Sequence, residues 1–141
     1  MDHIAAYVDG RNVPNLGSGF AVILLSTNDR WERSLAYGMH TVNAADLLGV
    51  KFALLSIAKP FDKLPVKIYI KNQYVIDMMK STNGVYDLVP KANYELVDEI
   101  RAIIDTKKVE FIIDSDHELS KKCHELSIKA IKNNELVNFR K

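Results

Sequence analysis

The sequence predicts an α/β domain in which helices flank a five-stranded mixed sheet. Two observations lead to this prediction. Apolar runs of strand length follow one another over the first part of the chain, and apolar residues then recur at helical spacing between two further short runs. A meander followed by alternating helices and strands is typical of a mixed sheet covered by helices. With 141 residues, 48% of them hydrophobic, the chain can form one domain with its own core.

The first three strands are expected to form an antiparallel meander. Their apolar runs are residues 4–8, 20–26 and 31–39. The first run ends at Asp9-Gly10, which is a turn signal, and residues 11–19 are rich in asparagine, glycine and proline, which predicts a loop. Residues 27–29 predict a hairpin turn between the second and third strands.

The later elements alternate between helix and strand. A central helix, apolar around most of its circumference, is expected to be buried in the domain. Asn43 is its expected N-cap, Asp46 follows three residues later, and Pro60 ends the helix. The remaining elements are strands at residues 66–70 and 109–113, which add to the sheet in parallel, and helices at residues 73–80, 94–104 and 120–134.

Charge and cysteine content limit the classes of function. The 19 basic and 18 acidic side chains nearly cancel to a net charge of +1, which argues neither for nor against a polyanionic partner. Cys123 is the one cysteine, so an intramolecular disulfide is excluded and a reducing compartment is expected. The sequence predicts neither a signal peptide nor a membrane span. We expect a cytoplasmic protein with a single domain over residues 1–141, of which residues 135–141 form a loose basic tail.

Six short motifs carry a resemblance to a known family. They are Tyr7-Val8-Asp9-Gly10, Asn15-Leu16-Gly17-Ser18-Gly19, Asn43-Ala44-Ala45-Asp46-Leu47, Gln73-Tyr74-Val75, Lys91 through Leu96, and Cys123-His124-Glu125-Leu126. In this order and spacing, over residues 4–134, they resemble type 1 ribonuclease H. The resemblance implies a ribonuclease-H-like fold. It also implies the activity of that family, which is metal-dependent cleavage of the RNA strand in RNA/DNA hybrids.

The departures from the family pattern fall on its metal site. The four acidic positions of the family correspond here to Asp9, Asp46, Lys71 and His124. In the family, these carboxylates hold two divalent cations about 4 Å apart, which activate water and stabilise the leaving oxygen. A charged lysine has no acceptor atom, and imidazole is a poor ligand for Mg²⁺. The resemblance therefore implies a degenerate metal site that retains two carboxylates.

Lys71 is the residue that we expect to replace the metal. Two carboxylates about 4 Å apart, with no cation between them, would repel each other by roughly 4 kcal/mol at an effective dielectric constant of about 20. An ammonium between Asp9 and Asp46 would offset this repulsion, so we predict a metal-free ion cluster of these three side chains. Plainer interpretations stay open for each residue. Asp9 could be a turn aspartate, Asp46 an acid in the first turn of a helix, and Lys71 a solvated lysine at the end of a strand.

A displaced metal site is the alternative. Asp114 or Asp116, in the polar loop after the last strand, could join Asp9 and Asp46 in holding Mg²⁺ or Mn²⁺, although a helix-capping loop would contain the same residue types. His117 in that loop resembles the family's mobile histidine, which is thought to aid product release.

Nucleic-acid contacts are expected from two groups of residues. The matched motifs indicate Asn15, Asn43 and Gln73, and the basic last helix indicates Lys121, Lys122 and Lys129. Residues 119–141 hold six basic and two acidic side chains, which fits phosphate contact but also an ordinary solvated helix face. Residues 81–91, where the family has a basic protrusion, hold a single lysine.

Two functions of different classes follow. The preferred one is a catalytically silent ribonuclease-H-like module that works without a cofactor and binds nucleic acid, as hybrid or duplex, or a protein partner. The alternative is an active metal-dependent ribonuclease H with a non-standard site. A subunit that pairs with an active homologue and contributes structure only is a third, weaker hypothesis.

Overall fold

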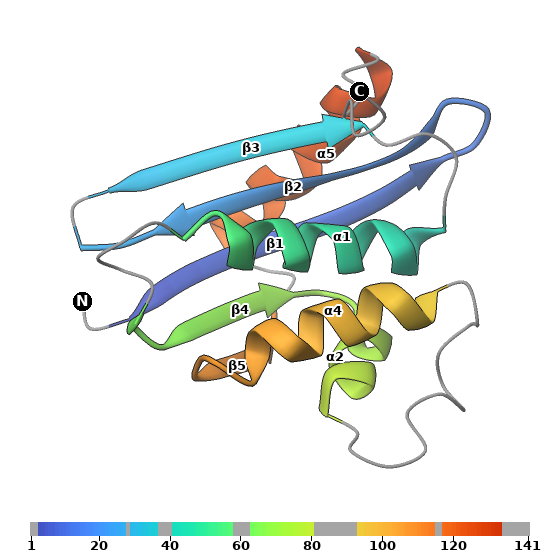
Figure 1. Cartoon of the computed structure of the whole chain (residues 1–141). Coiled ribbons are helices and arrows are strands. Elements are labelled where there is room, and N and C mark those ends of the chain that lie inside the picture. Colours follow the sequence, from blue (N-terminus) through green and yellow to red (C-terminus); the bar gives the residue numbers. More distant parts are fainter. Residues whose placement is uncertain are drawn as a thin grey trace.

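The computed structural model describes residues 3–27, 29–36, 41–57, 63–80, 93–114 and 117–133. Its sheet has five strands in the order β3-β2-β1-β4-β5 (Figure 1). The strands are β1 (Ile4–Val13), β2 (Gly17–Leu25), β3 (Arg30–Ala36), β4 (Val66–Ile70) and β5 (Val109–Ile113). The first three pair antiparallel, whereas β4 pairs parallel with both β1 and β5. This topology confirms the predicted mixed sheet.

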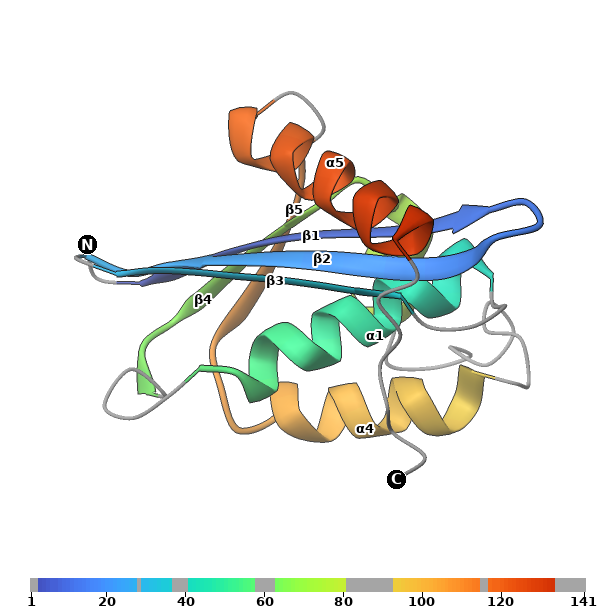
Figure 2. The ribbon, with the colours of Figure 1, turned by 90° about the horizontal axis from the view of Figure 1, so that it is seen from above.

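Helices cover both faces of the sheet. They are α1 (Val42–Leu55), α2 (Gln73–Lys80), α4 (Tyr94–Ile104) and α5 (Glu118–Lys132). Seen from above, α5 lies on one face and α1 with α4 on the other (Figure 2). The central α1 packs on β1, β2 and α4, and α5 packs on β1, β2 and β3. None of the helices described is long and apolar enough to cross a membrane.

The alternation of side chains along β1 divides the core in two. Ile4, Ala6 and Val8 belong to the larger core on the α1 face, and Ala5 and Tyr7 belong to the smaller core on the α5 face. Because β1 is buried on both faces, its first half is an uninterrupted apolar run in the sequence.

Cys123 lies in the smaller core. Its side chain is fully buried, and its thiol donates a hydrogen bond to the Tyr7 carbonyl oxygen at 3.2 Å. Burial, followed by the nearby charge of Asp9, raises the pKa of this thiol to about 12. The thiol therefore stays protonated, and its role here is to pack against the sheet.

The first hairpin corrects one prediction. Most of residues 11–19, predicted as a loop, belong to β1 and β2, and only residues 14–16 form the turn. Leu16 N–H donates to the Val13 carbonyl at 3.0 Å, and Asn15 has a left-handed φ of 68°. Proline followed by a left-handed asparagine suits a type II turn. The polar residues around this turn pair across the two strands, and their polarity hid the strands from sequence reasoning.

The helix starts correct two more predictions. The N-cap of α1 is Thr41, whose Oγ1 accepts a hydrogen bond from Ala44 N at 3.1 Å, and not Asn43, which lies in the first turn. The last helix begins at Glu118, two residues before the predicted start, with His117 as its N-cap. Four predicted features lie outside the described residues: the end of the third strand, the stop at Pro60, the end of the last helix at residue 134 and the basic tail. Residues 81–91 lie outside them as well.

Candidate functional site

The register of the sheet brings Asp9 and Lys71 side by side. Val8 pairs with Ile70 in the parallel β1–β4 ladder, so the next residue of each strand continues the same alignment. Lys71 Nζ lies 3.0 Å from Asp9 Oδ1, in an ion pair with one buried and one accessible partner. Asp9 is 4% exposed, whereas the Lys71 side chain is 30% exposed.

Three further side chains surround Asp9 on the α5 face. We call the whole group the ionic set: Asp9, Arg11, Lys71, His124 and Ser127. Arg11 Nε lies 3.7 Å from Asp9 Oδ2. The Ser127 hydroxyl lies 2.9 Å from Asp9 Oδ2 and also 2.9 Å from the His124 carbonyl oxygen, so its single proton serves one acceptor at a time. Both oxygens of Asp9 therefore have partners.

The contacts of His124 fix its protonation and tautomer. Its Nδ1 lies 3.1 Å from Arg11 Nε and 3.3 Å from Lys71 Nζ, and 3.6 Å from Asp9 Oδ2. Guanidinium and ammonium groups can only donate hydrogen bonds, so Nδ1 accepts and the ring proton is on Nε2. Burial, then the charges of Arg11 and Lys71, lower the pKa of His124 against the opposing effect of Asp9. The contacts and the lowered pKa both favour the neutral ring.

A second group of residues holds Asp46 on the α1 face. We call it the amide set: Asp46, Gly10, Asn43 and Asn72. Asp46 Oδ1 accepts from the Gly10 backbone N–H at 2.6 Å, and Oδ2 accepts from Asn72 Nδ2 at 2.9 Å. The same Asn72 nitrogen lies 2.7 Å from Asn43 Oδ1. At its other end, Asn72 Oδ1 accepts from the backbone N–H of Tyr74 at 3.0 Å, which caps α2.

Gly10 makes the contact between α1 and β1 possible. A Cβ atom at this position would lie 2.4 Å from Asp46 N and 2.7 Å from Ala45 C, both of which are backbone atoms of α1. Only a residue without a side chain lets the helix approach closely enough for the Gly10 N–H to reach the Asp46 carboxylate.

The two sets stay separate because side chains alternate along a strand. Asp9 points to the α5 face, while Gly10 meets α1 on the other. Within the described ranges, no cation lies within ion-pair distance of Asp46. Burial, with a smaller contribution from the charge of Asp9, raises its pKa from 3.8 to about 7, and hydrogen bonds from Asn72 and Gly10 and the charge of Lys71 only partly offset this. Lys71 thus pairs with one carboxylate and does not bridge two, which corrects the predicted arrangement.

Comparison with known proteins identifies the fold. No protein-family model matches the chain, and no curated protein matches it. Among solved structures, LC11 ribonuclease H1 in complex with an RNA/DNA hybrid superposes with a TM-score of 0.78 at 22% identity, covering 93% of this chain and 98% of that one. The chain has a ribonuclease-H-like fold.

Two further structures agree with this fold. The N-terminal ribonuclease H domain of Rv2228c from Mycobacterium tuberculosis, solved as a fusion with maltose-binding protein, gives a TM-score of 0.73 at 16% identity, covering 94% of this chain and 96% of that one. Ribonuclease H1 from the halophilic archaeon Halobacterium salinarum gives 0.67 at 20% identity, covering 93% and 98%. At the level of the fold, the predicted resemblance is confirmed.

The residues of this ribonuclease-H-like chain do not fit the pair of divalent cations that the family resemblance implies. Mg²⁺ needs free oxygen ligands in octahedral geometry. Here the oxygens of Asp9 contact Lys71 and Ser127, and those of Asp46 contact Gly10 and Asn72. In the part of the chain that the structure describes, no three His, Cys, Asp or Glu side chains lie close enough together to hold one ion.

The loop residues of the alternative metal site lie at the start of α5. His117 Nδ1 accepts from Leu119 N at 3.0 Å, and Asp114 Oδ1 accepts from His117 N at 3.0 Å. The His117 ring stacks on Tyr7, with ring centroids 4.9 Å apart. These contacts are those of a helix cap. Asp116 lies outside the described residues.

Of the residues predicted to contact nucleic acid, only Asn43 belongs to either set. Asn15 is exposed at the tip of the first hairpin, and Gln73 is exposed with its Nε2 donating to Asp77 Oδ1 at 2.8 Å. The three lysines of α5 are also exposed: Lys121, Lys122 and Lys129.

Sequence reasoning missed four members of the two sets: Gly10, Arg11, Asn72 and Ser127. Two signals could have identified some of them. Arg11 follows Asp9 by two residues, so a strand through both puts them on one face. Asn72 directly precedes a helix, which is where a capping side chain is expected. Treating residues 11–19 as a loop removed the first of these signals.

Proposed function

We propose that this chain is a catalytically silent ribonuclease-H-like module that binds nucleic acid. The observation that supports silence is the 3.0 Å contact between Lys71 Nζ and Asp9 Oδ1. It brings a positive charge against the carboxylate that would be the first metal ligand in the family. A divalent cation at Asp9 would be repelled by both Lys71 and Arg11, so we infer that metal-dependent hydrolysis has been lost.

The ionic set also supports a phosphate contact. Arg11 and Lys71 are 34% and 30% exposed, so each keeps part of its charged group open to solvent. Asp9 balances one of these two positive charges, and the raised pKa of Asp46, about 7, leaves that carboxyl partly protonated at neutral pH. An accessible excess of positive charge attracts phosphate groups. This charge excess favours nucleic acid over a protein partner.

The class of nucleic acid is proposed from the structural likeness. LC11 ribonuclease H1 was solved with an RNA/DNA hybrid, and we propose a hybrid or duplex as the ligand here. Six residues are proposed as further contacts: Asn15, Asn43, Gln73, Lys121, Lys122 and Lys129. The single-domain organisation over residues 1–141 is part of the same proposal.

A cleavage assay tests silence. Wild type and Lys71→Asp are incubated with labelled RNA/DNA hybrid in Mg²⁺ and in Mn²⁺, and metal binding is measured by calorimetry in parallel. We expect no cleavage and no stoichiometric metal binding by the wild type, and gained metal binding by Lys71→Asp because a carboxylate replaces the repelling ammonium. Wild-type cleavage that Asp9→Asn abolishes would overturn the proposal in favour of an active nuclease.

A binding assay tests the ligand. Gel shifts with hybrid, duplex and single strands across a salt series should give a steep salt dependence. Lys71→Gln and Arg11→Gln should each lower the slope of log affinity against log salt by about 1. The matched control is Lys67→Gln, which removes a charge four residues earlier on β4 and should leave the slope near the wild-type value. Absence of binding at low salt would contradict nucleic acid and point to a protein partner.

A further inference from the structure

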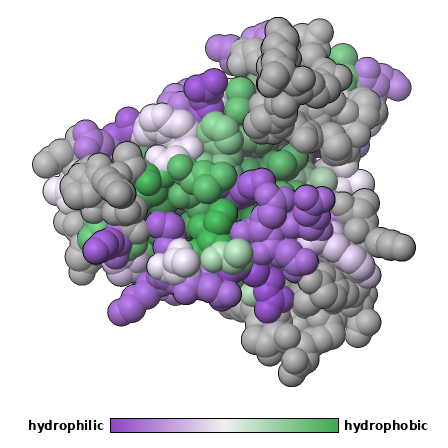
Figure 3. All heavy atoms as spheres, viewed as in Figure 1, coloured by the Kyte–Doolittle hydropathy of each residue, from purple (hydrophilic) through white to green (hydrophobic). Residues whose placement is uncertain are grey.

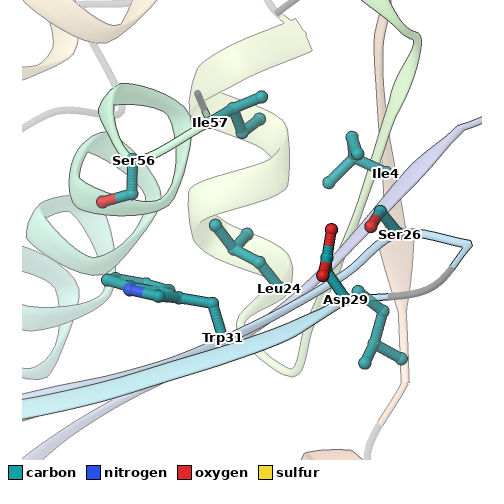
Figure 4. A pocket seen from close by; sticks show the side chains of 8 residues that line it. Ile4, Leu24, Ser26, Asp29, Trp31, Ser56 and Ile57 are labelled. Atoms are coloured by element: carbon teal, nitrogen blue, oxygen red, sulfur yellow. The ribbon is translucent and has the colours of Figure 1, made fainter. Parts of the chain in front are cut away.

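A small pocket lies at the end of the sheet opposite the ionic and amide sets. Its volume is about 180 Å³, and it is bordered by the start of β1, by the end of β2 and the start of β3, and by the C-terminal end of α1 (Figure 4). Ile4 in the pocket precedes Asp9 by five residues on the extended β1, which separates the two by about 16 Å. The proposed nucleic-acid function makes no use of this pocket.

The walls of the pocket are mainly apolar. The apolar side chains that line it include Ile4, Leu24, Ile57 and Trp31. Trp31 is 37% exposed, and it stacks on Phe52 of α1 with ring centroids 6.0 Å apart and an interplanar angle of 20°. Hydrophobic residues also gather at the surface over the middle of the face that carries α1 (Figure 3). A short aliphatic chain would find van der Waals contacts between these walls.

Two polar groups lie on one side of the pocket. In Figure 4 the side chains of Asp29 and Ser26 lie together, with the Trp31 indole across from them and Leu24 between. Asp29 is exposed at the rim of the pocket, and the Ser26 hydroxyl is buried with no partner among the described residues. An unpaired buried hydroxyl costs about 1–3 kcal/mol. A ligand with hydrogen-bond donors would relieve that cost after a rotation of the Ser26 side chain.

We propose that this pocket binds a lysine side chain of a partner polypeptide. The ammonium contacts Asp29 and Ser26, and the methylene groups pack against Leu24, Ile57 and the Trp31 ring. Three acceptor oxygens match the three donors of an ammonium, whereas the five donors of arginine would exceed them. A tryptophan ring beside the path of the cation adds attraction. The volume is sufficient, since a cavity of about 150 Å³ holds benzene.

Trp31 makes the proposal directly measurable, because it is the one tryptophan of the chain. The 141-residue chain is titrated with Nα-acetyl-lysine N-methylamide while tryptophan fluorescence is recorded. We expect a saturable change with a dissociation constant on the order of 1 mM, since few atoms are buried. The Nε-acetylated derivative and the norleucine analogue, which lack the charge, should bind at least about tenfold more weakly.

Two variants separate a specific contact from general charge attraction. Asp29→Asn should weaken lysine binding at least about tenfold, because the ammonium loses its counter-ion. Glu32→Gln makes the same change of charge one residue beyond Trp31, on the other face of β3, and should change the affinity less than about twofold. Circular dichroism checks that both variants are folded.

Three outcomes would overturn the proposal. Equal binding of lysine and norleucine analogues would make the pocket a purely apolar site. The corresponding arginine compound is titrated in the same way. If it bound as tightly as the lysine compound, the argument from the number of donors would be wrong. Equal losses of affinity for the lysine compound in Asp29→Asn and Glu32→Gln would show that the attraction comes from net charge and not from a contact with Asp29.

Discussion

Asp9 and Asp46 are buried to the same degree, 4% exposed each, yet they are stabilised in different ways. Asp9 in the ionic set faces two cations, one of them 3.0 Å away. Asp46 in the amide set is held by a backbone N–H and an asparagine amide, both of which are neutral. Burial, with a smaller contribution from the charge of Asp9, raises the pKa of Asp46 to about 7, although the hydrogen bonds and the charge of Lys71 oppose the shift. Two carboxylates with the same exposure therefore have partners of different kinds, charged in one set and neutral in the other.

The amide set depends on a close contact between the backbones of β1 and α1 at Gly10. We therefore expect a substitution of Gly10 to lower the stability of the protein more than any other single substitution in the two sets. Gly10→Ala would push a Cβ against the backbone of α1, which cannot move as a side chain would. The free energy of unfolding should fall by about 3 kcal/mol, measured by urea denaturation. Gly49→Ala is the comparison, because its Cβ would meet a Val8 methyl group and alanine is the better helix former. A loss at Gly49 as large as that at Gly10 would contradict a special role for the close approach.

Asp46 should make stability depend on pH. Its folded pKa of about 7 exceeds the ordinary 3.8, so the folded state binds the extra proton. Its stabilising effect is therefore fully present below pH 3.8 and is lost as pH rises through 7. Between pH 5 and pH 8 the free energy of unfolding should fall by about 2–3 kcal/mol through this one group, and Asp46→Asn should remove that dependence.

Urea unfolding at several pH values measures the difference between wild type and Asp46→Asn. The difference is needed because His124, whose pKa is lowered, acts in the opposite direction. Equal pH dependence of wild type and variant would show that Asp46 has no raised pKa. Asp105→Asn at the exposed C-cap of α4 serves as the surface control.

The ionic set should show coupling between its side chains. Lys71→Met removes the counter-ion closest to buried Asp9, and we expect a loss of about 1–2 kcal/mol, moderated because Lys71 is partly exposed and Arg11 remains. In a double-mutant cycle with Asp9→Asn, part of that loss should be recovered, because the uncompensated charge is gone. Strict additivity of the two single changes would argue against a working ion pair.

Substitution of Ser127 should lower the stability least. Ser127→Ala removes one hydrogen bond to Asp9, while Lys71 still contacts the other oxygen, so we expect a loss of about 1 kcal/mol or less. Asn72→Ala in the amide set should cost more, because Asn72 serves both Asp46 and the cap of α2. Thermal denaturation of the two variants compares them. The reverse order would indicate that Asp9 depends on its serine more than Asp46 depends on its asparagine.

Helices and strands with a regular pattern of apolar residues could be predicted from the sequence, whereas strand segments made mainly of polar residues could not. The ranges of β4, α2, α4 and β5 agree with the predictions. The second half of β1 was missed because its stability comes from cross-strand pairing and a tight turn at Asn15. The choice of Thr41 over Asn43 as N-cap also depends on tertiary contact, since Asn43 is engaged by Asn72 from a different element.

The sequence by itself determined the order of the elements, the mixed sheet and the positions at which the family pattern changes. These follow from the period of apolar residues and from short motifs, both of which are local. The tertiary structure decided which carboxylate Lys71 serves. Strand alternation and the β1–β4 register put Lys71 beside Asp9 on one face of the sheet, while Gly10 and Asn72 hold Asp46 on the other. Residues far apart in the chain set that partnership, and no local pattern encodes it.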